Sequence, residues 1–268
     1  MGDSPIAHRV NAERVVVLGW PRAILMQMAH PLIAAGVADH SSFRDGPVAS
    51  ATRLHATVHA MLMILFGDAG ARERTIDGIR AIHRRVNGTL REPVGGFAAG
   101  TRYSAEDPAL LRWVHLTLLE SVPLIYERVV RPLTPHERDA YCRESAWVPI
   151  ALGANDDEIP TTWNEAMRAI DEMLASGTLA IGADARAIAG ALLRPPLSTL
   201  VWPVRRLQQR VTLGTLPPTL RAAYGFASAP ADLDGTFRRL RRIRRAVPDR
   251  IAHWGIARTG ARGLGRRA

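Results

Sequence analysis

The sequence predicts an all-α fold with a single multi-helix domain, and three observations support this. Apolar residues recur at three- and four-residue steps through most of the chain, whereas the alternating pattern of strands is absent. Helix start signals, such as a proline or a capping box, precede several of these stretches. With 268 residues and 47% apolar residues, the chain can bury a core without disulfide bonds or structural metal ions. We expect one domain over residues 10–230 and an arginine-rich helix and tail over residues 231–268.

The predicted helices of the first half begin near the N-terminus and are separated by prolines and glycines. They cover residues 11–18, 21–28, a helix restarting at Pro31, then 47–67, 71–87 and 104–120, with a glycine-rich loop over residues 88–101. Asp107 lies where the acid of a capping box is expected. The last turns of the 47–67 helix are apolar on all sides, so we expect this helix to be central and buried.

The second half carries the clearest start signals. Thr134 to Glu137 and Thr162 to Glu165 are capping boxes, because a threonine precedes a glutamate by three residues. Further helices are expected to begin at Asp184 and to cover residues 197–213 and 231–246. No internal repeat and no domain linker interrupts the pattern.

Charge and cysteine content exclude several classes of protein. The net charge of +10 resides in residues 236–268, which hold 11 arginines and one acid, while the remainder has 24 basic and 24 acidic residues. The body is therefore not a nucleic-acid-binding surface. A single cysteine, Cys142, excludes an internal disulfide and cysteine-rich metal sites. We find no signal peptide and no apolar run of membrane-spanning length, and expect a cytoplasmic protein.

The arginine-rich segment allows two interpretations. Arginines surround Leu240 and Ile243 between residues 238 and 245, so a basic amphipathic helix could make peripheral contact with an anionic membrane. The alternative is a solvated end, which is the usual state of a charged run.

Two histidines occupy apolar helical stripes. His83 recurs with Ile76, Ile79 and Val86, while charged residues fall on the other side of that helix. His115 shares a stripe with Leu111 and Leu118. A buried imidazole needs a partner, so each is either a hydrogen-bonded core histidine or a ligand of a metal or haem. The remaining histidines that we considered are expected to cap a helix (His30) or to face solvent (His8, His40, His136 and His253).

The 47–67 helix also carries polar residues. At about 100° per residue, Arg53 and Thr57 share a face from which His55 points away. An arginine on a buried helix needs an anionic partner, which could be a cofactor carboxylate, a bound oxygen species or an acid such as Asp39. A structural salt bridge is the alternative. Dinucleotide, P-loop and serine-hydrolase motifs are absent.

Several segments, in this order and spacing, resemble one family. They are Leu25–Pro31, Asp39–Phe43, Arg53–Thr57, Leu65–Gly67, Ile82–Gly88, Tyr103–Pro108, Trp113–His115, Leu216–Pro218 and Leu220–Arg221. Together they are similar to the catalytic domain of the oxygenase MpaB and the latex-clearing (rubber oxygenase) proteins, over about residues 10–250.

The resemblance implies a globin-like helical core and a b-type haem (haem b) bound through one proximal histidine. The family's histidine falls on His83, and its distal arginine and threonine fall on Arg53 and Thr57. An upstream acid falls near Asp39. The distal lysine of the rubber oxygenases is replaced by Ala56, which departs from the pattern of enzymes with a polymer substrate.

The function that this resemblance implies is a haem-dependent oxygenase. His83 would ligate the iron, with Arg53 and Thr57 as catalytic distal residues near dioxygen and His115 as a further cofactor-contacting residue. The substrate would be a small or medium-sized apolar molecule that contains an alkene, and an isoprenoid-like molecule is one such substrate. The alternative is a non-catalytic helical protein with packed core histidines and membrane contact through its tail.

Overall fold

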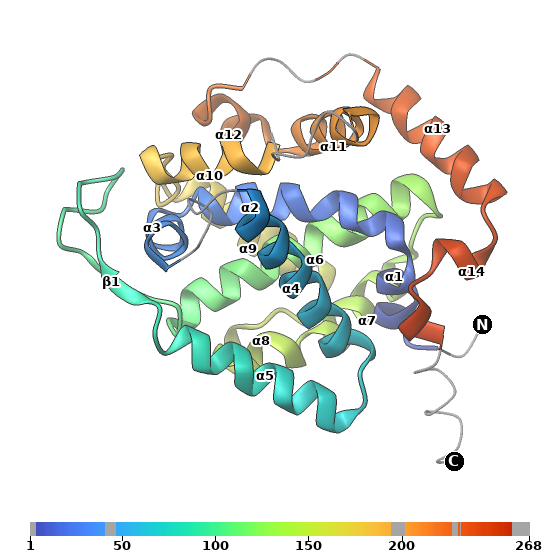
Figure 1. The fold of residues 1–268 in the computed structure, drawn as a ribbon, viewed down its shortest axis with the longest axis horizontal. Coiled ribbons are helices and arrows are strands. Elements are labelled where there is room, and N and C mark those ends of the chain that lie inside the picture. The colour runs from blue at the N-terminus through green and yellow to red at the C-terminus, as the bar shows by residue number, and fades with distance from the viewer. Residues whose placement is uncertain (1–3, 41–46, 194–201, 227–229, 231, 259–268) are drawn as a thin grey trace.

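The computed structural model describes residues 4–40, 47–193, 202–226, 230 and 232–258, with the backbone alone for residues 47–55. Figure 1 shows the arrangement of its elements. The first half contains α1 (Ile6–Ala12), the 3-10 helix η1 (Arg14–Gly19), α2 (Trp20–Met28), α3 (Pro31–His40), α4 (Pro47–Phe66), α5 (Ala69–His83), β1 (Asn87–Thr89), β2 (Arg102–Ser104) and α6 (Pro108–Val129). The second half contains α7 (Pro135–Ser145), α8 (Trp147–Leu152), the 3-10 helix η3 (Asp156–Glu158), α9 (Trp163–Ala175), α10 (Ala183–Leu193), α11 (Trp202–Thr215), α12 (Pro218–Ala223), α13 (Leu233–Ala246) and α14 (Asp249–Ala252).

The predicted all-α class is confirmed, with one small exception. Two three-residue strands pair antiparallel, with Gly88 opposite Tyr103. We expected a loop and a helix start there, because such short strands show no alternation. Helix α6 begins at Pro108 instead of Ser104, since the carboxylate of Asp107 accepts the backbone N–H of Ala109 as an N-cap at 2.9 Å.

The expected first helix over residues 11–18 is also wrong. The chain forms α1, breaks at Glu13 and continues as η1. Glu13 has an extended backbone that pairs in an isolated antiparallel bridge with His253. A tertiary contact with the far end of the chain therefore overrides the local helical pattern.

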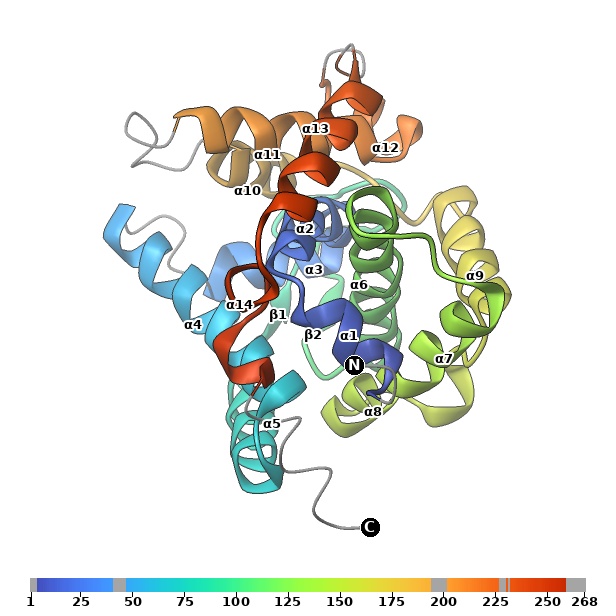
Figure 2. The ribbon, with the colours of Figure 1, turned by 90° about the vertical axis from the view of Figure 1, so that its right-hand side faces the viewer.

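Helix α6 runs through the centre of the fold and packs against η1, α2, α9 and α13 (Figure 2). Trp113 on α6 is fully buried, and its indole nitrogen donates to the carbonyl oxygen of Met26 at 3.2 Å. Gly19 allows η1 to approach closely, because a Cβ at this position would clash with the carbonyl oxygen of Ser121.

Arg22 joins three elements inside this core. Its guanidinium donates two hydrogen bonds of 2.8 Å to the carboxylate of Glu120, and further bonds to Ser121 Oγ and to the carbonyl oxygen of Thr215. The side chain is only 4% exposed. Buried arginines are tolerated when their charge and donors are paired, as here, so α2, α6 and α11 are held at one point.

Helix α4 lies at the edge of the molecule, contrary to our expectation of a central, buried helix (Figure 2). Among its described side chains, Ile64 and Phe66 are buried, whereas Thr57 and His59 are exposed. The apolar C-terminal turns are covered on one side by Trp254 and Ile256 from the end of the chain. A helix apolar on all sides is thus only partly buried here.

The arginine-rich helix α13 packs on the body. Phe237 and Leu240 are buried against Ile125, Val129 and Val211. The predicted membrane face of Leu240 and Ile243 is therefore wrong for Leu240, whose side chain already lies in the core. The proposed division at residue 230 stays a prediction.

Ion pairs join the C-terminal segment, from α13 to α14, to the N-terminal segment at Glu13. Arg244 donates to both carboxylate oxygens of Glu13 at 2.6 Å, and the ring of His253 lies 3.0 Å from the same carboxylate. His253 is buried, so the expectation that it faces solvent is wrong. In the described part of the chain, no helix combines the length and apolar character that a membrane span needs.

Candidate functional site

Helix α5 presents His83 at its last residue. The helix begins where the carboxylate of Asp68 accepts the backbone N–H of Ala71 at 2.7 Å, which satisfies an otherwise unpaired donor. Ile76 is buried, Ile79 is half-buried and Arg80 is exposed. The predicted amphipathic stripe is thus present, and it turns His83 toward the protein.

His83 is a half-buried imidazole with an unused nitrogen. Its Nδ1 is buried and has no hydrogen-bond partner among the described residues. Burial lowers the pKa of His83, and the nearby carboxylate of Glu106 opposes this shift only partly. The ring is therefore neutral at neutral pH and keeps a lone pair, which is the form that ligates a metal.

The small sheet explains why Glu106 lies near His83. The backbone N–H of Val86 donates to the carbonyl oxygen of His83, and the carbonyl oxygen of Val86 accepts from Ala105, both at 2.9 Å. The strand pairing thus folds residue 106 back to the end of α5. Sequence reasoning missed Glu106, although it lies within a segment that carried the resemblance.

His115 lies in the middle of α6 and is 8% exposed. Its Nε2 has no partner among the described residues, and burial lowers its pKa to about 4. The environment of His115 therefore suits a metal-ligating histidine as well as the environment of His83 does. The structure thus keeps both histidines as candidates.

Arg53 and Thr57 lie on α4, but their relation to His83 differs from the simple expectation. Thr57 is exposed, and the side chain of Arg53 is outside the described residues, as is that of His55. Helices α4 and α5 diverge from the turn at Gly67, as Figures 1 and 2 show. A pocket shared by Arg53, Thr57 and His83 stays a prediction.

His30 is a further buried histidine whose environment the sequence did not reveal. It is 5% exposed, its Nδ1 has no described partner, and its ring lies 5.6 Å from that of Phe97. Burial lowers its pKa to about 4. We expected a helix cap, because Pro31 follows it; the contact with the distant Phe97 left no local signal.

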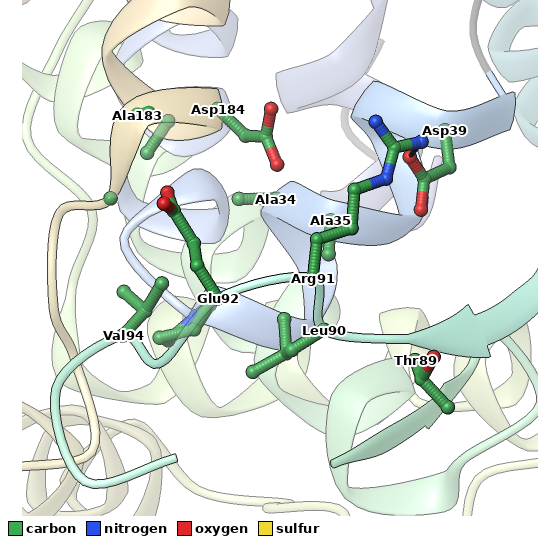
Figure 3. Close-up of a pocket in the computed structure, with 13 residues that line it drawn as sticks. Ala34, Ala35, Asp39, Thr89, Leu90, Arg91, Glu92, Val94, Ala183 and Asp184 are labelled. Atoms are coloured by element: carbon green, nitrogen blue, oxygen red, sulfur yellow. Dashed lines mark hydrogen bonds and ion pairs between the residues drawn. The ribbon is translucent and has the colours of Figure 1, made fainter. Parts of the chain in front are cut away.

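A pocket lies elsewhere, between α3, the loop after β1 and the start of α10 (Figure 3). Its volume is about 230 Å³. Asp39 lines it, forms an ion pair with Arg91, and accepts the hydroxyl of Tyr103 at 2.7 Å. Both contacts use the carboxylate of Asp39, which we had considered as a partner for Arg53. Burial and the bond to Asp39 raise the pKa of Tyr103.

Most of the chain matches one protein family. Residues 8–247 match the family described as ER-bound oxygenase mpaB/B'/Rubber oxygenase, catalytic domain. The chain belongs to this family. No curated protein and no solved structure shows significant similarity to this chain.

Membership in this oxygenase family confirms the predicted resemblance and gives His83 its context. An oxygenase needs dioxygen, an oxidisable substrate and usually a metal or organic cofactor. The described residues contain no group of three or more histidine, cysteine or acidic side chains that could hold a bare metal ion. A cofactor that needs only one protein ligand, such as haem, fits a neutral histidine with an unpartnered nitrogen, which His83 and His115 both provide.

Proposed function

We propose that this chain is a haem-dependent oxygenase of an apolar alkene, with His83 as the protein ligand of a b-type haem. The observation that carries the proposal is the unpartnered, buried Nδ1 of His83 in a chain of the oxygenase family. A buried polar atom without a partner is often explained by a group that binds there. Five described histidines carry such an atom, and the family resemblance selects His83 among them.

The chain would hold the cofactor through a neutral imidazole. Burial keeps His83 unprotonated, so its lone pair is available without prior loss of a proton. Glu106 is the carboxylate whose charge acts on this ring. A negative charge near a ligating histidine raises the basicity of the ring, which supports an electrostatic role for Glu106.

Haem supplies the iron chemistry of dioxygen, whereas the protein supplies binding, orientation and exclusion of water. In this proposal, Arg53 and Thr57 of α4 would donate hydrogen bonds to the oxygen atoms of dioxygen.

A haemin titration tests this proposal. The wild-type chain is expected to shift the Soret band of haemin at one equivalent, whereas His83→Ala weakens binding by more than roughly 10-fold, since loss of a ligand exceeds loss of an outer partner. The exposed His136 provides a matched control, and His136→Ala is expected to bind haemin normally.

Two outcomes contradict the proposal. If the wild-type chain gives no Soret shift, the histidines are packed core residues. If His115→Ala loses the band while His83→Ala keeps it, the ligand is His115.

A further inference from the structure

Helix α13 carries a basic outer surface that its packing does not explain. The helix lies on the outside of the molecule, between α11 and α14 (Figures 1 and 2). Its exposed arginines are Arg238, Arg239, Arg242 and Arg245. The acids around it are already paired: Asp232 with Arg238, Asp234 with Arg128 and Asp249 with Arg244. Among the described residues, no acid pairs with Arg239, Arg242 or Arg245.

An exposed stripe on this surface combines charge with apolar side chains. Arg239, Arg242, Ile243 and Ala246 are separated by three and four residues, so they share one face of the helix. All four are exposed, and Ile243 is 58% exposed. This stripe is distinct from the buried stripe of Phe237 and Leu240, which already accounts for the attachment of α13 to the body.

A shallow apolar groove of about 170 Å³ begins beside Ile243. Its apolar lining comes from Val15, Leu240, Ile243, Val247 and Ala252. The charged residues at the groove are occupied within the protein, because Arg244 binds Glu13 and the guanidinium of Arg14 lies over the ring of Trp254. The groove therefore presents mainly apolar surface next to free positive charge.

We propose that the exposed face of α13 docks on an anionic phospholipid bilayer, with Arg239, Arg242 and Arg245 at the headgroups and Ile243 at the acyl boundary. Charge complementarity selects an anionic partner. The protruding Ile243 and the apolar groove select a bilayer over a nucleic-acid backbone, because only the bilayer offers an apolar layer under its anionic surface. This surface would bring the chain to the phase in which apolar molecules dissolve, and it does not depend on haem binding.

Co-sedimentation of the full chain with vesicles tests the proposal. Vesicles of phosphatidylcholine containing phosphatidylserine are expected to bind the wild-type chain. Binding is expected to be at least roughly 10-fold weaker to vesicles of phosphatidylcholine alone, or at high salt. The triple variant Arg239→Gln, Arg242→Gln and Arg245→Gln is expected to lose roughly 100-fold in affinity, about fivefold per arginine.

A matched control removes the same charge from other surfaces. Arg74, Arg80 and Arg186 are exposed and lie on α5 and α10, and their combined change to glutamine is expected to weaken binding by less than about threefold. Ile243→Ser keeps the charge and is expected to weaken binding roughly fivefold, through the loss of apolar burial. Circular dichroism verifies that each variant remains folded.

The proposal is overturned by any of three results. The wild-type chain fails to bind anionic vesicles; the two triple variants lose affinity equally; or Ile243→Ser binds as the wild type does while a polyanion such as heparin competes fully, which would indicate unspecific charge attraction.

Discussion

The core around α2 and α6 and the hairpin that α4 and α5 form differ in whether their buried polar side chains have hydrogen-bond partners. In the core, Arg22 and Trp113 are buried and their donors are paired within the protein. In the hairpin, His83 is half-buried and keeps an unpartnered nitrogen. The core thus gains rigidity from internal bonds, whereas the hairpin retains capacity for a ligand. His115 is the exception, since it lies on α6 but shares the unpartnered state of His83.

The largest effect should follow from breaking the core bond network. Arg22→Met leaves Glu120 without its partner and removes bonds to Ser121 and Thr215, and is expected to lower the free energy of unfolding by about 3–5 kcal/mol. Urea denaturation followed by circular dichroism measures it. The exposed Arg80 on α5 is the control, and Arg80→Met should change stability by less than about 0.5 kcal/mol. Equal effects would contradict the comparison.

The burial of His115 should cause a smaller, pH-dependent loss in the free energy of unfolding. Burial lowers its pKa from 6.5 to about 4, so between these values the unfolded chain binds a proton that the folded chain does not. The free energy of unfolding should therefore fall as the pH falls through this window, by about 3 kcal/mol for this residue. Denaturation curves at a series of pH values measure the slope.

His115→Leu should remove this contribution and leave stability near neutral pH almost unchanged, because it also removes an unpartnered buried nitrogen. The variant should still lose some stability as the pH falls, because the pKa of His30 is also about 4. His136→Leu is the exposed control. An unchanged slope in His115→Leu would show that His115 is not a buried neutral histidine.

The smallest effect is expected at the start of α5. Asp68→Ala removes the side-chain acceptor for the backbone N–H of Ala71, and should cost about 1 kcal/mol. Hydrogen exchange should show faster exchange in the first turn of α5 and no change in α6. Faster exchange throughout α6 would mean that hairpin and core unfold as one unit.

Local signals predicted the local structure well. The capping boxes at Thr134 and Thr162 form as expected, because both threonine and glutamate side chains bond to the backbone within one turn. Errors arose where distant contacts decide. Glu13 leaves the helix to pair with His253, and Trp254 and Ile256 cover only part of the apolar surface of α4. No local pattern carries that information.

The candidate site shows the same division. The apolar stripe of α5 predicted that His83 faces the protein, and the family match supports the oxygenase interpretation. The approach of Glu106 depends on pairing between β1 and β2, and the burial of His30 depends on Phe97. These contacts join residues from separate elements, so spacing along the chain could not predict them.

The absorption spectrum of His83→Gly with haemin tests the central claim most directly. We expect the variant to lack the Soret shift of the wild type, and free imidazole to restore it by filling the space of the missing side chain. A wild-type spectrum without added imidazole, or a loss that imidazole does not repair while His115→Gly is repaired, would contradict ligation by His83.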